Sequence, residues 1–250
     1  MATLPKTTSG QPLTSDFDAV LFDWGGTLSL WADVVPAEMW RAGARAIRPA
    51  DHDELARMLL VVENEFWQVA HEGGAASGTT HQMVAETIRR LGYDHSEDEV
   101  GACVAAYLSA WEATFAHADD AAEVLTELRA SGVRTGLLSN THWPRALHDA
   151  ALERDGLLHL LDACVYSSEL EVMKPHPLAF QALLDAVGVA DPSRAVFVGD
   201  RPRDDISGAQ AAGMRTVLIG GRPVPGYDVT PDATIEKLSE LPGLLRAWSG

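Results

Sequence analysis

The surroundings of Asp23 indicate chemistry more clearly than those of any other residue. Asp23 follows four apolar residues, Ala19–Phe22, and precedes the segment Trp24-Gly25-Gly26-Thr27. An apolar run without polar alternation is typical of a strand buried on both faces, and the two glycines predict a tight turn directly after it. We therefore expect Asp23 at the carboxyl edge of a sheet, where open α/β folds bind their ligands. A carboxylate there can act as a nucleophile or hold a metal ion, although it can also simply begin the turn.

Three further polar clusters also follow predicted strands: Ser139-Asn140, Lys174-Pro175, and Gly199-Asp200 with the nearby Asp204 and Asp205. In a parallel sheet the ends of these strands meet at one edge, so the four clusters would share one site. Each cluster also has a plainer interpretation, because Asn140 can form a turn, Lys174 can be a solvated surface lysine, and Asp204 can cap a helix. The repetition of polar residues after four predicted strands favours the shared site.

The composition limits the kinds of partner. The chain has 250 residues, 46% of them hydrophobic, and a formal net charge of −17. Its length suits a sizeable core, and its charge opposes binding to nucleic acid and to anionic membranes. A small anionic substrate would therefore need a local cation or backbone N–H groups.

The expected location follows from the cysteines and from the lack of long apolar runs. Cys103 and Cys164 lie in apolar segments and are expected to be inert thiols in a reducing compartment. No signal peptide is recognisable after Lys6, and no apolar run reaches about 18 residues. We therefore expect a cytoplasmic protein without a membrane span.

The elements that must position these residues have two different patterns. From about 31 to 117 the pattern is helical throughout, with an amphipathic stripe over 51–71 and a capping box formed by Ser96 and Glu99. After about residue 119, short apolar runs alternate with helices, one of which is expected over 204–212. The apolar runs predict strands at 133–138, 163–166, 195–198 and 216–219, in addition to the first strand at about 17–22. This alternation predicts an α/β fold, in which a Rossmann-like parallel sheet carries a helical insert directly after its first strand.

The four clusters together resemble the motifs of the haloacid dehalogenase (HAD) superfamily. The segments are Leu21-Phe22-Asp23-Trp24-Gly25-Gly26-Thr27-Leu28, Leu138-Ser139-Asn140, Lys174-Pro175-His176-Pro177, and Val198-Gly199-Asp200-Arg201-Pro202-Arg203-Asp204-Asp205-Ile206. The resemblance covers a core of residues 16–30 and 118–250. The helical stretch 31–117 is similar in position and character to the cap domain of the family, which would lie over the carboxyl edge as a lid. Residues 1–15, rich in Thr, Ser, Pro and Gly, are expected to be a flexible tail.

This resemblance implies a phosphatase-like mechanism on a small phosphorylated metabolite. Asp23 would attack the phosphoryl group and form an aspartyl-phosphate, which water then hydrolyses, and Lys174 would neutralise charge beside it. The implied Mg²⁺ ligands are Asp23, the backbone carbonyl of Gly25, Asp200 and Asp205, with Asp204 as the alternative to Asp205. The implied substrate-binding residues are Ser139, Asn140, Gly26 and Thr27.

The sequence departs from the phosphatase pattern at Gly25, where phosphatases of the family carry a second Asp as general acid and base. Such a group contributes about 10²–10⁴ in rate. Either the substrate has a good leaving group, or another group such as His142 or a cap residue replaces the Asp, or the protein is a weakly catalytic or non-catalytic phosphate- or partner-binding protein.

Two branches of the family that also lack this Asp provide alternatives. Phosphonate-cleaving members use a cap lysine, and the insert has none. Members that act as 2-haloacid dehalogenases use no metal and generally lack the Gly-Asp that is intact here at Gly199-Asp200. Arg41 or Arg45 near the start of the insert could receive a halide or a carboxylate, or could belong to a solvated helix face. Trp31, also near that start, is close enough in sequence to line the pocket.

Overall fold

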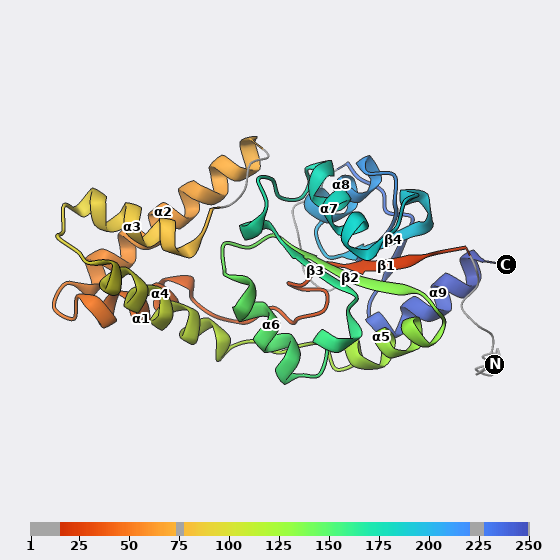
Figure 1. Cartoon of the computed structure of the whole chain (residues 1–250), viewed down its shortest axis with the longest axis horizontal. Helices are drawn as coiled ribbons and strands as arrows, with labels where there is room; N and C mark the ends of the chain where they lie inside the picture. Colours follow the sequence, from red (N-terminus) through yellow and green to blue (C-terminus); the bar gives the residue numbers. More distant parts are fainter. Residues whose placement is uncertain (1–15, 74–77, 221–227, 250) are drawn as a thin grey trace.

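The computed structural model describes residues 16–73, 78–220 and 228–249, so the expected tail at 1–15 lies outside the described residues. Within them, six parallel strands form one sheet in the order β3-β2-β1-β4-β5-β6 (Figure 1). The strands are β1 (Ala19–Phe22), β2 (Arg134–Ser139), β3 (Ala163–Tyr166), β4 (Ala195–Gly199), β5 (Arg215–Ile219) and β6 (Ala233–Ile235). The expected α/β fold with a parallel sheet is confirmed.

Helices cover both faces of this sheet because its central strands are apolar on both sides. Val20 and Phe22 of β1 face a cluster formed with α5 (Ala121–Ala130), α6 (Arg145–Arg154) and α9 (Leu241–Trp248). Leu21 faces the opposite cluster, formed with α7 (Pro177–Val187) and α8 (Gly208–Ala211). Figure 1 shows α5 and α9 on one side of the sheet and α7 and α8 on the other. This burial on two faces explains why β1 and β4 read as continuous apolar runs.

The strand register brings the polar clusters to one edge. Phe22, the last residue of β1, pairs with Leu137 of β2 and with Val198 of β4. Asp23, Ser139 and Asp200, which lie one or two residues beyond these paired positions, therefore reach the same edge of the sheet. Parallel pairing produces this alignment because the carboxyl ends of all strands point the same way.

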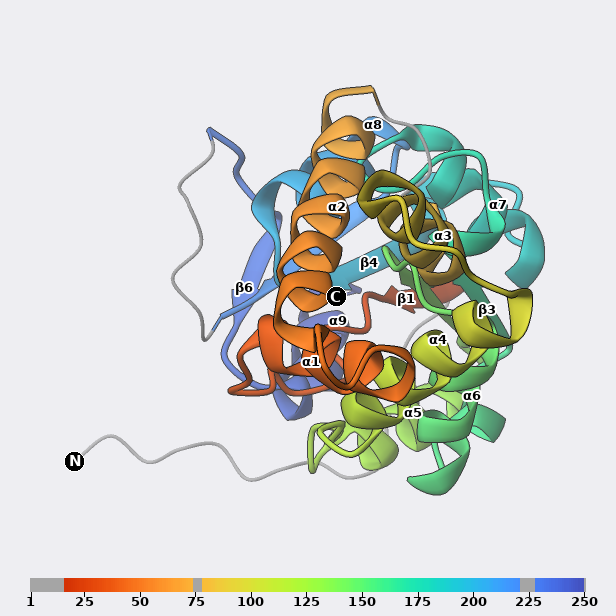
Figure 2. The ribbon, with the colours of Figure 1, turned by 90° about the vertical axis from the view of Figure 1, so that its left-hand side faces the viewer.

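The helical insert between β1 and α5 has a hydrophobic cluster of its own. It consists of α1 (Pro36–Ile47), α2 (His52–Gly73), α3 (Thr80–Leu91) and α4 (Glu97–Glu112). The cluster is centred on large buried side chains, including those of Trp40, Leu55, Leu59, Met83 and Tyr107. The capping box at Ser96 and Glu99 opens α4 as expected. Figure 2, viewed from the side of the insert, shows α1–α4 in front of the sheet.

The insert contacts the loops at the carboxyl edge of the sheet. The backbone N–H and the hydroxyl of Thr80, at the start of α3, both donate to the carbonyl of His142, which follows β2. The guanidinium of Arg203, which follows β4, donates to the carbonyl of His71 near the end of α2. Among the described residues, no helix is long and apolar enough to cross a membrane.

The structure differs from the sequence-based expectation at both ends of the core. The first strand begins at Ala19 instead of residue 17, and β6 and α9 near the C-terminus were not predicted. The helix expected over 204–212 is a wide π-helical turn, Pro202–Ser207, followed by the short α8. The carbonyl of Arg201 accepts the N–H groups of both Asp205 and Ile206, and the Asp205 carboxylate accepts the N–H of Arg201. These bonds widen the turn and fold the Asp205 side chain back toward β4.

One buried residue of this fold predicts a pH-dependent stability. Burial lowers the pKa of His148 from 6.5 to about 3, and its ring stacks on Tyr166 at 4.7 Å. In the unfolded chain this histidine is protonated below about pH 6.5, whereas in the folded protein it stays neutral down to about pH 3. The free energy of unfolding therefore falls as the pH decreases through this window. Between about pH 7.5 and about pH 5 the free energy of unfolding of the native chain should decrease. In His148→Phe this decrease should be smaller by about 2 kcal/mol, as measured by urea denaturation at the two pH values.

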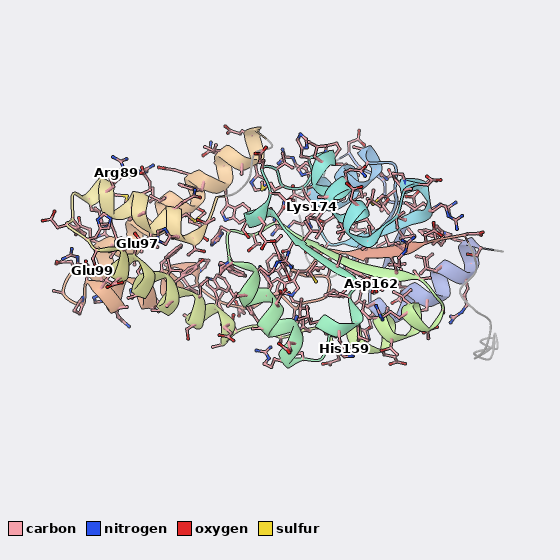
Figure 3. All side chains as sticks on the ribbon, viewed as in Figure 1. Arg89, Glu97, Glu99, His159, Asp162 and Lys174 are labelled. Atoms are coloured by element: carbon pink, nitrogen blue, oxygen red, sulfur yellow. The ribbon has the colours of Figure 1, made fainter. Side chains whose placement is uncertain are left out.

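The matched control for this experiment is His159→Phe, because His159 is exposed and lies at the edge of the molecule in Figure 3. This variant should keep the full pH dependence of the native chain. Equal pH dependence in both variants would contradict the assignment to His148.

Candidate active site

The site is built around the ammonium group of Lys174, which is 1% exposed. Its Nζ donates to Asp23 Oδ1 at 2.5 Å, to Asp205 Oδ1 at 2.8 Å and to the carbonyl of Leu138 at 2.9 Å. Three acceptors satisfy all three N–H groups of the ammonium. Lys174 lies in the middle part of the molecule in Figure 3, between the insert and the far end of the core.

Three carboxylates gather beside this lysine. Asp23, Asp200 and Asp205 are all buried, and one oxygen of each lies within 4.8 Å of the others. Burial raises the pKa of Asp23 to about 7 against the opposing effect of Lys174, and the negative charges of Asp205 and Asp200 raise it further. One buried ammonium faces three buried carboxylates, so the cluster has an excess of negative charge.

The cluster has the properties of a site for a divalent cation. The Oδ1 atom of Asp200 is buried and has no hydrogen-bond partner among the described residues. An orphaned buried carboxylate oxygen is costly unless a cation or water satisfies it. Carboxylate oxygens at this spacing are the hard ligands that Mg²⁺ prefers, so the residues present fit this ion.

Asp205 and Asp204 have different surroundings. Asp205 belongs to the carboxylate cluster, whereas Asp204 Oδ2 lies 3.9 Å from His71 Nε2 and 3.6 Å from the guanidinium of Arg201. Burial acts to raise the pKa of Asp204, but His71 and Arg201 outweigh burial and lower it. The wide turn after β4 therefore separates two adjacent carboxylates, and only Asp205 reaches Asp23.

The expected substrate-binding residues occupy different environments. Ser139 is buried and lines the cavity described below. Asn140 also lines it, but its amide accepts the backbone N–H of Lys174 and donates to the Lys174 carbonyl, both at 2.8 Å. Asn140 therefore holds the Lys174 backbone and keeps one further N–H for a ligand. Gly26 and Thr27 are not among the described residues that line the cavity.

The two glycines after Asp23 have different structural requirements. Gly26 has φ +86°, and a Cβ there would lie 2.1 Å from Trp31 Nε1 and 2.4 Å from Asp200 Oδ2, so only glycine fits. Gly25 lies outside the left-handed region, and a Cβ there would meet only the Trp31 ring, at 3.7 Å. The missing side chain at position 25 is therefore not a requirement of the backbone.

Trp31 ties the start of the insert to this cluster. Its indole Nε1–H donates to Asp200 Oδ2 at 2.9 Å, and the guanidinium of Arg201 lies 5.2 Å from its ring centroid. The sequence suggested Trp31 as a pocket residue but not this contact, because nothing local links residues 31 and 200. Arg201 was also missed, although its position directly after Asp200 is a usable signal.

A cavity of about 500 Å³ opens from the cluster toward the insert. Its walls come from both the core and the insert, and they include Asp23, Gly25, Lys174, Arg201, Trp31, Leu60, Glu63, His71, His142 and the half-buried Trp67, Trp111 and Trp143. The volume is that of a small-molecule site. Arg41 and Arg45 do not line it; Arg41 instead pairs with Glu38 and Asp53.

A buried polar network joins the insert to the core at the wall of this cavity. Glu63 accepts hydrogen bonds from Trp40 Nε1 at 2.6 Å and from the Tyr107 hydroxyl at 3.3 Å. His142 Nε2 lies 3.1 Å from the same hydroxyl and 3.3 Å from Glu63 Oε1. Burial lowers the pKa of His142 to about 3, so this imidazole is neutral near pH 7. A neutral imidazole is a poor substitute for the missing acid.

Comparison with known proteins identifies the family of the chain. Residues 17–213 match the family of haloacid dehalogenase-like hydrolases. The chain is 31% identical over 243 residues to a glyceraldehyde 3-phosphate phosphatase of Methanopyrus kandleri, covering 91% of this chain and 97% of that protein. It is also 31% identical over 192 residues to (S)-2-haloacid dehalogenase 4A of Burkholderia cepacia, covering 76% of this chain and 74% of that protein.

The fold is similar to that of a solved structure, a HAD phosphatase from Thermococcus onnurineus. The TM-score is 0.63 at 23% identity, and the match covers 92% of this chain and 98% of that one. The family resemblance of the four motifs is thereby confirmed, and the chain belongs to the haloacid dehalogenase-like hydrolases.

Proposed function

We propose that this hydrolase is a Mg²⁺-dependent phosphomonoesterase that acts on a small phosphorylated metabolite through an aspartyl-phosphate on Asp23. The observation that carries the proposal is the convergence of Asp23, Asp200 and Asp205 within 4.8 Å beside the ammonium of Lys174. Phosphoryl transfer depends mainly on positioning and on charge stabilisation, and this cluster is suited to both.

The chain's own residues account for the two steps. An oxygen of Asp23 attacks phosphorus, the bond from phosphorus to the leaving oxygen breaks, and the electron pair departs with that oxygen. Water then attacks phosphorus, which releases inorganic phosphate and restores the carboxylate of Asp23. Lys174 orients Asp23 through Oδ1, and Asn140 holds the backbone of Lys174 in place. Ser139 and the remaining N–H of Asn140 are the proposed donors to the phosphoryl oxygens.

Mg²⁺ would be held by Asp23, Asp200, Asp205 and the carbonyl of Gly25, and when bound it supplies positive charge for the carboxylates and the phosphoryl oxygens. The orphaned Oδ1 of Asp200 supports this assignment. We also assign the protein to the cytoplasm, on the basis of two free thiols, Cys103 and Cys164.

The proposal predicts that Asp23→Asn abolishes catalysis. An amide cannot form the acyl-phosphate, so Mg²⁺-dependent release of phosphate from phenyl phosphate should fall by at least about 1,000-fold. Asp18→Asn is the matched control, since Asp18 lies just before β1 and pairs with Arg194, and this variant should stay active. Equal rates for Asp23→Asn and the native chain would refute the assignment of Asp23 as the nucleophile. If the protein instead released chloride from a 2-haloacid, and a metal chelator did not reduce this activity, a dehalogenase would be favoured.

The proposal also predicts which motif-four carboxylate holds the ion. Asp205→Asn should weaken Mg²⁺ binding by about 10- to 100-fold in titration calorimetry, because it removes a charge from the cluster. Asp204→Asn should change the affinity much less, because Asp204 faces His71 and Arg201 instead. The reverse order of the two effects would assign the ligand to Asp204.

A further inference from the structure

An aromatic ring lies beside the place of the missing acid at Gly25. A Cβ at this position would lie 3.7 Å from Trp31 Cη2, so the Trp31 ring lies beside the space that an acidic side chain would enter. The indole is held there by its hydrogen bond to Asp200 and by the guanidinium of Arg201. An indole N–H cannot be given up as a proton to a leaving oxygen.

Other groups at the cavity are also poorly suited to protonate a leaving group. All three N–H groups of Lys174 are engaged by Asp23, Asp205 and the Leu138 carbonyl. His142 is neutral and faces Tyr107 and Glu63. His71 remains, with Nδ1 2.7 Å from the Trp67 carbonyl and Nε2 toward Asp204. Nδ1 is therefore engaged, whereas Nε2 is 3.9 Å from Asp204, too far for a hydrogen bond, so a His71 variant belongs in the experiment below.

Part of the cavity wall is aromatic. Trp67 on α2, Trp111 on α4 and Trp143 after β2 each line it and are half-buried. The rings of Trp111 and Trp143 lie 5.0 Å apart, and the Trp67 ring lies 5.6 Å from that of His142. Such surfaces bind a planar apolar group through its ring faces and edges.

The charge of this wall does not favour a second anionic group on the substrate. Among the described cavity residues, the Lys and Arg side chains are those of Lys174 and Arg201, and both belong to the carboxylate end. Glu63 and His71 are the titratable residues nearer the tryptophans; Glu63 accepts hydrogen bonds from Trp40 and Tyr107, and the His71 ring lies 5.9 Å from that of Trp67. A carboxylate or a second phosphate would find no Lys or Arg side chain there among the described cavity residues.

We infer that the preferred substrates are phosphate monoesters of phenol-like aromatic alcohols, whose ring packs against Trp67, Trp111 and Trp143 and whose oxygen leaves without a proton from the protein. This inference rests on the proposed phosphatase function. As Asp23 attacks phosphorus, the P–O bond to the aryl oxygen breaks and both electrons stay on that oxygen. The aryl oxide then takes a proton from water. A phenol, with a pKa of about 10, leaves far more readily than an alcohol close to the value of about 16 for water.

Three phosphate esters and one acyl phosphate separate the two parts of the inference. Phenyl phosphate has an aromatic ring and a good leaving group, benzyl phosphate has the ring and a poor leaving group, acetyl phosphate has only the good leaving group, and n-butyl phosphate has neither. We expect kcat/KM for phenyl phosphate to exceed that for benzyl phosphate by at least about 100-fold. KM for phenyl phosphate should lie about tenfold below that for acetyl phosphate.

Variants test the wall and the missing acid separately. Trp67→Leu should raise KM for phenyl phosphate about five- to tenfold and leave KM for acetyl phosphate unchanged. The control is Trp248→Leu on α9, because Trp248 is also half-buried but lies outside the cavity. This variant should change neither KM value. Gly25→Asp should narrow the gap between phenyl and benzyl phosphate, because it returns an acid to a backbone that accepts a side chain. His71→Gln should leave that gap unchanged.

Each outcome decides a separate claim. Similar kcat/KM values for phenyl and benzyl phosphate, or a selective loss of benzyl phosphate turnover in His71→Gln, would overturn the inference while the phosphatase assignment stands. Equal effects of Trp67→Leu on phenyl and acetyl phosphate would overturn the aromatic wall. Failure to release phosphate from any of the four compounds would overturn the phosphatase assignment itself, and the inference with it.

Discussion

The buried ammonium group of Lys174 is the interaction on which the site depends. Its three hydrogen bonds join Asp23 after β1, the carbonyl of Leu138 in β2 and Asp205 after β4, while Lys174 itself comes from the loop that follows β3. One side chain therefore holds the ends of four strands together. Removing a charge from water is costly unless every polar atom is satisfied, and here every N–H of the ammonium has an acceptor. Asn140 completes the arrangement by binding both polar groups of the Lys174 backbone.

The reacting groups come from the core, whereas much of the surface that would select a substrate comes from the insert. The core supplies the carboxylates, the lysine and Trp143, whereas the insert supplies Trp67 and Trp111 to the same cavity. The two parts meet through buried polar contacts, such as those between Thr80 and His142 and between Glu63 and His142. A change at Trp67 or Trp111 can therefore alter the aromatic wall, whereas a change at Trp31, at the start of the insert, also reaches Asp200.

The neighbouring glycines show how this site departs from the pattern of phosphatases in the family. At Gly26 a side chain would collide with Trp31 and Asp200, so the glycine is a steric necessity. At Gly25 neither the backbone nor the contacts demand glycine. The absence of an acid there is thus a chemical feature of the site, and the ring of Trp31, which binds Asp200, lies beside that position.

The sequence by itself determined the α/β fold, the insert after the first strand and the edge at which Asp23, Ser139, Lys174 and Asp200 would meet. These predictions succeeded because buried parallel strands have a local signature, and parallel pairing brings their carboxyl ends to one edge. The resemblance to the family favoured Asp205 over Asp204, and the tertiary structure places Asp205 in the carboxylate cluster because hydrogen bonds of the wide turn after β4 direct the two adjacent side chains apart. The tertiary structure alone decided the contact between Trp31 and Asp200 and the tryptophan wall, since these depend on how the insert packs against the core, and no local pattern encodes a contact between such distant residues.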